Sequence, residues 1–187
     1  MTSASTCSCP APDGSGQRRW NLVLGAFVIT VGGFLKYHYS TANADELGYV
    51  LAPTAAVVRL VTGAQVVAEA GAGYLSQELS ILIAPSCAGV NFLVIAWCML
   101  GLGFVRQVSL PHAKLAWLAL SAALAYTTTV LVNAARIVFG SALQSAPPGW
   151  APLPAEQVHR VEGVVVYLTA LLVLFSLATN VVRRGAA

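Results

Sequence analysis

Long apolar blocks alternate with short polar segments along this chain, a pattern typical of a helical membrane protein. Four blocks approach the length of a transmembrane helix, which needs about 20 predominantly apolar residues. They cover residues 20–37, 90–105, 115–139 and 161–182. We therefore predict an all-α fold: a polytopic integral membrane bundle of about four transmembrane helices.

A fifth apolar segment, Leu47–Ala68, is interrupted by Pro53, Arg59 and Gln65. An arginine at the centre of a span costs about 2.5–3.5 kcal/mol on insertion scales. We therefore predict an extracytoplasmic helix that begins near Pro53 and packs, half-buried, at the membrane surface. A further span is the alternative. Glycines within residues 71–74 predict a turn after this helix.

The N-terminal residues 1–19 are rich in Ser, Pro and Gly, and we expect a disordered cytoplasmic tail there. Residues 20–184 would then form a single membrane domain. Ala42-Asn43-Ala44 is similar to a signal-peptidase site, so a cleaved signal peptide is an alternative to the first span. The apolar stretch before it is long for a signal peptide, which favours a retained span.

The basic residues indicate which side of the membrane each loop occupies. In the four-span interpretation one side carries Arg18, Arg19, Arg106, Lys114, Arg183 and Arg184. By the positive-inside rule this side is the cytoplasm. Residues 38–89 and 140–160 are then extracytoplasmic, and they hold nearly all the acidic residues. A fifth span would move four of the basic residues outside, so four spans are preferred.

Composition supports the membrane assignment and excludes several function classes. The 187 residues are 57% hydrophobic and 9% charged, with a net charge of +3. Soluble domains carry about 25% charged residues. There is no basic patch interleaved with aromatics, so we expect no nucleic-acid partner. No Cys/His cluster has zinc spacing, and we predict neither a metal nor a cofactor.

Of the four cysteines, only Cys87 has a setting that suggests chemistry. Cys7 and Cys9 lie in the tail, and Cys98 lies inside an apolar block, where a cysteine usually acts as a small core residue. Cys87 precedes the second span at a helix start, between Pro85 and Gly89. Backbone N–H groups and the positive helix end there favour a thiolate, the nucleophilic form of cysteine.

The four-span topology brings Cys87, Arg136 and His159 to the same outer side of the membrane. An arginine can donate several hydrogen bonds to a developing oxyanion, and a histidine can carry a proton at neutral pH. Together they would support acyl transfer from a peptide. The alternatives are a buried small residue at Cys87, an arginine that reaches the interface at Arg136, and a surface histidine at His159.

Neighbouring polar residues could support these three. Asn133 lies three residues before Arg136 and therefore on the same helical face. Asn91 lies on the helix that follows Cys87. Glu156 lies three residues before His159 and could orient the imidazole, with Glu162 as the alternative.

Three segments resemble the exosortase/archaeosortase family. They are Cys-Ala-Gly-Val-Asn-Phe at 87–92, Asn133-Ala-Ala-Arg136, and Val158-His159 followed by Gly163. Their order along the chain, at the ends of successive spans, is similar too. The similarity extends over roughly residues 45–182. Many members have more spans, so this chain resembles a short form of the exosortase K type.

The resemblance implies a membrane-embedded cysteine protease or transpeptidase that cleaves C-terminal sorting signals, such as PEP-CTERM tails, of exported proteins. It implies that Cys87 is the nucleophile, Arg136 the transition-state stabiliser and His159 the acid/base. The site would face the periplasm from a bacterial inner membrane. Two alternatives stay open: a protease that only hydrolyses, and a non-catalytic membrane scaffold or transporter subunit.

Overall fold

The computed structural model describes residues 14–108, 110–144 and 155–185. For a few residues at the edges of these ranges, Glu156 and His159 among them, only the backbone is described. The tail predicted at residues 1–19 lies mostly outside this part. Its last residues are helical, because the first helix begins at Gly14 rather than near residue 20.

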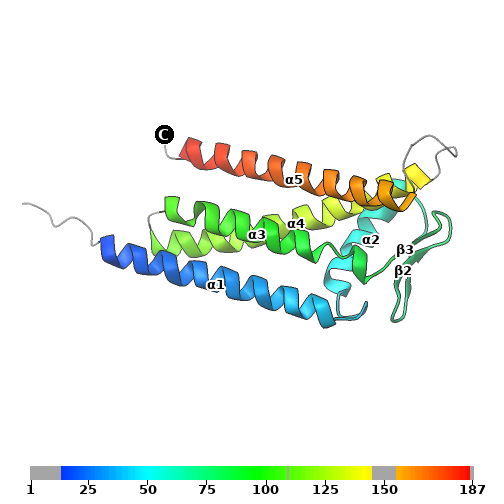
Figure 1. Cartoon of the computed structure of the whole chain (residues 1–187), viewed down its shortest axis with the longest axis horizontal. Helices are drawn as coiled ribbons and strands as arrows, with labels where there is room; N and C mark the ends of the chain where they lie inside the picture. The colour runs from blue at the N-terminus through cyan, green and yellow to red at the C-terminus, as the bar shows by residue number, and fades with distance from the viewer. Residues whose placement is uncertain (1–13, 109, 145–154, 186–187) are drawn as a thin grey trace, which may run out of the picture.

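Four long helices run alongside one another and account for most of the described residues (Figure 1). They are α1 (Gly14–Thr41), α3 (Val90–Phe104), α4 (Pro111–Gln144) and α5 (Ala155–Gly185). Each belongs to a stretch that is long and apolar enough to cross a membrane. The predicted all-α membrane bundle is therefore confirmed.

The helix α3 forms the centre of the bundle, and α5 lies at its surface. Within the described residues, 56% of the most apolar part of Pro85–Gln107 is buried, against 11% for Arg160–Arg184. Phe104 at the end of α3 stacks near Trp117 of α4 and Phe175 of α5, with ring centroids 5.8 and 5.7 Å away. The outward faces of α1 and α5 carry exposed Leu, Val and Phe side chains, as contact with lipid requires.

The shorter helix α2 (Gly48–Thr62) packs against α4 with one buried face and leaves Arg59 exposed. A half-buried surface helix was predicted, but its expected start near Pro53 is wrong. Proline cannot donate to the carbonyl four residues earlier, which here belongs to Tyr49. The Tyr126 hydroxyl of α4 donates to that carbonyl at 2.6 Å. Contact with α4 therefore lets the helix begin before its proline.

A small antiparallel sheet, which was not predicted, follows α2. Its strands β1 (Val67–Glu69), β2 (Gly73–Ser76) and β3 (Ile81–Ile83) lie in the order β1-β2-β3. Ala68 is opposite Tyr74, which is opposite Ile83 on its other side. The turn expected at residues 71–74 is only partly right, since Gly73 and Tyr74 already belong to β2. Strands of three or four residues are too short to show a clear alternation of apolar and polar residues in the sequence.

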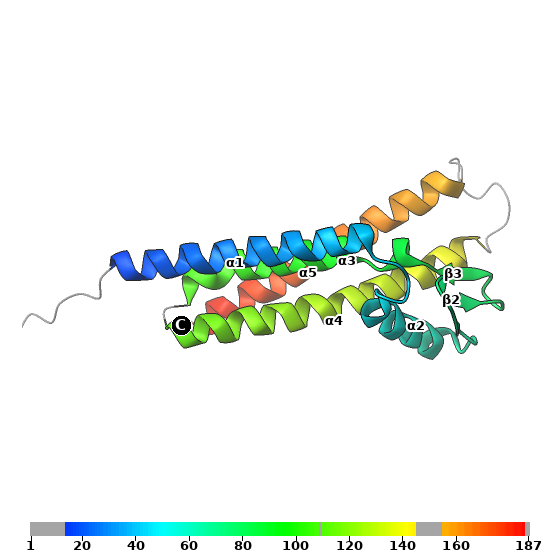
Figure 2. The same cartoon turned by 90° about the horizontal axis from the view of Figure 1, so that it is seen from below.

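Different structural elements lie at the two ends of the bundle (Figures 1 and 2). At one end lie α2, the sheet and the start of α5. At the other end lie the start of α1, the end of α5 and the connection between α3 and α4, which includes the short helix η2 (Val105–Gln107). Lys114 was expected in that connection, but α4 already begins at Pro111, and the side chain of Lys114 is buried within the bundle.

Candidate functional site

Cys87 lies in η1 (Pro85–Cys87), a 3-10 helix of one turn that joins β3 to α3. Its backbone N–H donates to the Ala84 carbonyl at 2.8 Å. Gly89 follows with a φ of 67°, a left-handed conformation that suits glycine, and caps the start of α3. The turn therefore presents a free, half-buried thiol at the entrance to α3, where the sequence places it.

Asn133, fully buried on α4, holds this turn in place. Its side-chain nitrogen donates a hydrogen bond to the Cys87 carbonyl. A Cβ atom at Gly89 would come within 3.3 Å of both Asn133 and Thr129, so the absence of a side chain there allows the turn to approach α4. Asn133, a predicted supporting residue, thus connects the cysteine turn to α4, the helix that also contains Arg136.

Arg136 lies one turn further along α4, and its guanidinium group reaches α5. Its Nη1 donates to the Tyr167 hydroxyl at 3.4 Å, and its Nε is 4.0 Å from a carboxylate oxygen of Glu162. The guanidinium carbon also lies 5.4 Å from the centre of the Tyr167 ring, a cation–π distance. Both charged side chains are largely buried, 18% exposed for Arg136 and 8% for Glu162.

Tyr167, which sequence reasoning missed, connects these residues. Its hydroxyl donates to the Asn133 side-chain oxygen at 2.9 Å while accepting from Arg136. Its ring lies 5.2 Å from that of Phe92 on α3. The one sequence signal was a tyrosine four residues after Gly163, on the same helical face of an apolar span.

Gly163 on α5 makes room for the guanidinium group of Arg136. A Cβ atom built at Gly163 would lie 2.8 Å from Arg136 Nε, closer than real Cβ contacts. The glycine that follows Val158-His159 in the sequence is therefore a packing partner of Arg136. The same close approach brings α4 and α5 together at this depth of the bundle.

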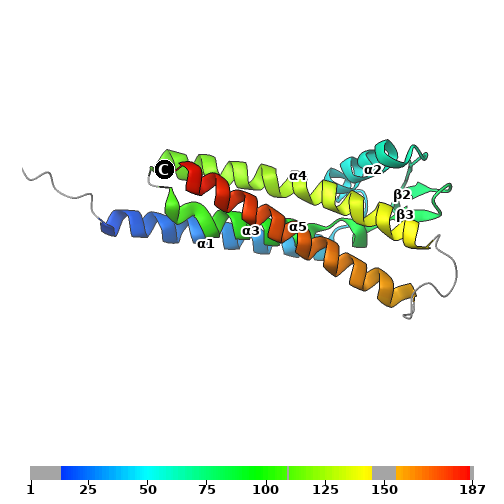
Figure 3. The ribbon, with the colours of Figure 1, turned by 90° about the horizontal axis from the view of Figure 1, so that it is seen from above.

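His159 and Glu156 belong to the first turns of α5, but their side chains lie outside the described part of the structure. These first turns diverge from the rest of the bundle (Figures 2 and 3). The expected approach of His159 to Cys87 and the support of His159 by Glu156 therefore stay predictions. Glu162, considered as the other support for His159, lies beside Arg136.

Asn91, a predicted supporting residue, is hydrogen-bonded to helix α1. It is exposed, and its side-chain oxygen accepts a hydrogen bond from Lys36 Nζ of α1 at 2.6 Å. It therefore ties α1 to the start of α3, while Asn133, Arg136 and Tyr167 form a separate network between α4 and α5.

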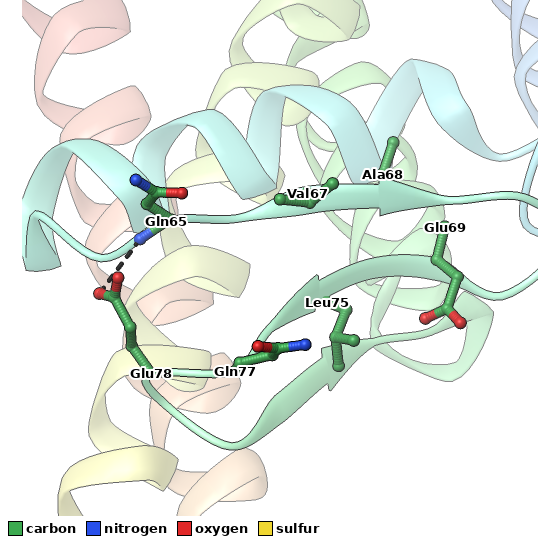
Figure 4. Close-up of a pocket in the computed structure, with 7 residues that line it drawn as sticks. All are labelled: Gln65, Val67, Ala68, Glu69, Leu75, Gln77 and Glu78. Carbon is green, nitrogen blue, oxygen red and sulfur yellow. Dashed lines mark hydrogen bonds between the residues drawn. The ribbon is translucent and has the colours of Figure 1, made fainter.

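A cleft of about 350 Å³ beside β1 also lies at this end of the bundle (Figure 4). The Gln65 backbone N–H donates to a Glu78 carboxylate oxygen at 3.2 Å across it. Its lining is Gln65, Val67, Ala68, Glu69, Leu75, Gln77 and Glu78. Neither Cys87 nor Arg136 takes part in this lining.

Comparison with known proteins adds no relative. No protein-family model matches the chain, no curated protein matches it, and no solved structure matches it. The chain is thus a helical membrane bundle in which an asparagine, an arginine and a tyrosine link the turn of a free cysteine to two neighbouring helices.

Proposed function

We propose that the chain is a membrane-embedded cysteine protease or transpeptidase that cleaves C-terminal sorting signals of exported proteins. The observation that carries this proposal is the contact network of Asn133. It binds the Cys87 carbonyl on one side and Tyr167, a partner of Arg136, on the other. A cysteine and an arginine distant in sequence thereby share one polar network inside an apolar bundle.

The proposed reaction begins when the Cys87 thiolate attacks the carbonyl carbon of the scissile peptide bond. The carbonyl oxygen becomes an oxyanion, which Arg136 stabilises through its fixed guanidinium group. Collapse of this intermediate breaks the C–N bond, and His159 protonates the departing amine. The remaining thioester is then attacked by an acceptor amine, or by water, whose proton passes to His159, and Cys87 leaves as a thiolate.

The burial of Arg136 and Glu162 supports a chemical role for this network. Charged groups within membrane helices are costly and usually serve function. Tyr167 and Glu162 restrain the guanidinium group, so it need not reorganise when an oxyanion forms. The acidic segments between α1 and α3 would face the periplasm, and the basic ends of α1 and α5 the cytoplasm, of a bacterial inner membrane.

The proposal is tested by mass spectrometry of the C-terminal peptides of exported proteins. Cells that carry the wild type are compared with cells that carry Cys87→Ala at a matched protein level. Cys98→Ala is the control, because Cys98 is a second half-buried free cysteine further along α3. We expect a defined set of proteins to keep an apolar C-terminal tail in Cys87→Ala cells but not in the control.

The new C-termini found with the wild type would report the cleavage motif and any attached acceptor. A free carboxylate at every new end would indicate hydrolysis, and an amide-linked group would indicate transpeptidation. If Cys87→Ala and wild-type cells gave the same C-terminal peptides, the catalytic proposal would be wrong and a scaffold or transporter subunit would be the better interpretation.

A further inference from the structure

A cleft at the opposite end of the bundle from Cys87 is lined by positive charge. It has a volume of about 590 Å³ and lies between the first turns of α1 and the short helix η2. Its lining is Gln17, Arg18, Asn21, Leu22 and Arg106. Both arginines are exposed at the surface of the bundle, so their guanidinium groups are accessible to a ligand.

A buried lysine lies behind this cleft. Lys114 is only 1% exposed, and its ammonium group donates to the side-chain oxygen of Asn21, which lines the cleft. Lys114 also lies in the first turn of α4, where the helix dipole is unfavourable for a cation. A buried cation normally has an anionic partner, because removing it from water is costly.

No anion in the described part of the chain meets this need. No described carboxylate lies within ion-pair distance of Arg18, Arg106 or Lys114. The described acidic residues lie beyond the end of α1, in the segments around α2 and the sheet, or near the start of α5. The cleft therefore has two accessible cations in its lining and one buried cation behind it, and no described carboxylate balances them.

We infer that this cleft binds the phosphate group of an anionic phospholipid. Two arginines can hold phosphate oxygens in forked pairs of hydrogen bonds. Because Lys114 occupies the Asn21 oxygen, the amide nitrogen of Asn21 remains as a further donor. Basic pockets between transmembrane helices are suited to anionic headgroups.

The position of the cleft along α1 indicates a lipid rather than a free phosphate ion. Gln17 and Arg18 are polar, Trp20 is 49% exposed, and Leu22 and Val23 are 61% and 59% exposed. This change from polar to aromatic to apolar surface is the one found where a helix crosses the headgroup layer. A phosphate in the cleft thus lies at headgroup depth, and exposed apolar side chains extend below it for the acyl chains.

The test is native mass spectrometry of the purified full-length protein with phosphatidylglycerol or phosphatidylcholine of identical acyl chains. We expect retained phosphatidylglycerol and little phosphatidylcholine. Each arginine near an anionic headgroup contributes on the order of a fivefold gain in affinity. Arg18→Gln/Arg106→Gln should therefore weaken phosphatidylglycerol binding roughly 25-fold.

The matched control is Arg183→Gln/Arg184→Gln, which removes the same charge at the same end of the bundle but outside the cleft lining. It should bind phosphatidylglycerol almost as the wild type does. All four arginines are exposed, so both variants should keep wild-type helicity and melting temperature.

Three results would overturn the inference. If the control variant bound phosphatidylglycerol as weakly as Arg18→Gln/Arg106→Gln, the binding would depend on general surface charge and not on the cleft. Equal retention of both lipids would remove the role of the anionic headgroup. Displacement of phosphatidylglycerol by millimolar inorganic phosphate or glycerol phosphate would assign the cleft to a soluble phosphate. None of these readouts depends on the proposed peptide chemistry at Cys87.

Discussion

The helix α4 buries a cation towards each of its ends, and the two are balanced in different ways. Arg136 contacts a carboxylate and a phenol, both supplied by α5. Lys114 contacts the neutral amide of Asn21 on α1. The charge of Arg136 is thus compensated inside the chain, whereas Lys114 has no counter-charge among the described residues. A restrained guanidinium group fits the proposed catalysis, and an ammonium group without a described counter-charge fits the proposed external anion.

Removal of each cation in turn should have the largest effect on stability. Arg136→Met leaves the largely buried Glu162 without the arginine and should lower the free energy of unfolding by about 3 kcal/mol. Lys114→Met leaves only the Asn21 oxygen without its donor, and should change that free energy by no more than about 1 kcal/mol. Denaturation of both variants in the same detergent micelles would measure the difference. Equal losses would mean that Glu162 does not depend on Arg136.

Exchanging the two kinds of cation tests geometry separately from charge. Arg136→Lys keeps the charge but loses the guanidinium fork that spans Tyr167 and Glu162. Under the proposed function it should lower turnover about 100-fold, the effect of losing one oxyanion donor. Lys114→Arg should leave cleavage unchanged. The readout is the fraction of exported proteins with processed C-termini, and wild-type processing by Arg136→Lys would remove Arg136 from the mechanism.

Each cation also has a nearby asparagine, and these two should differ in importance. Asn133→Leu leaves the Cys87 carbonyl without its donor and the Tyr167 hydroxyl without its acceptor, costing about 2 kcal/mol of stability. Asn21→Leu removes one partner of Lys114 at the edge of a cleft that water can enter, and should cost about 1 kcal/mol. Thermal melts of the two variants compare them. If Asn133→Leu lowered the melting temperature less than Asn21→Leu, Asn133 would not anchor the cysteine turn.

The smallest effect tests the close approach of α4 and α5. Gly163→Ala places a methyl group against Arg136 Nε and should lower the free energy of unfolding by about 1 kcal/mol. Gly33→Ala is the control, since nothing lies within 4 Å of a Cβ atom there. Alanine favours a helix over glycine, so the control should be neutral or slightly stabilised. A gain of stability in both variants would show that the guanidinium group moves aside freely.

The order of structural elements was largely predictable, because crossing a membrane is a local requirement on the chain. A helix in lipid needs a long apolar run, which residues 20–37 or 161–182 show without reference to any other segment. The shared face of Asn133 and Arg136 follows equally from helical spacing. The start of α2 could not be predicted in this way. Pro53 leaves the Tyr49 carbonyl without a backbone donor, and the hydroxyl of Tyr126, on another helix, supplies the hydrogen bond.

The candidate site was predictable in part. Cys87, Asn133 and Arg136 stand out as chemically capable residues in apolar surroundings, and the structure brings all three into one network. Tyr167 did not stand out, since a tyrosine in a span is also typical of an interface residue. Glu162 was considered for His159 and lies beside Arg136 instead.

Four membrane helices, a half-buried fifth helix and the polar residues available for chemistry can all be predicted from the amino-acid sequence. Apolar run length and helical spacing are sufficient for these features. The pairs of polar groups depend on how the helices pack: Asn133 contacts the Cys87 turn, Tyr167 contacts Arg136, and Lys114 contacts Asn21. The physical reason is that a buried polar group takes its partner from whichever helix lies opposite, and the packing of helices sets that neighbour.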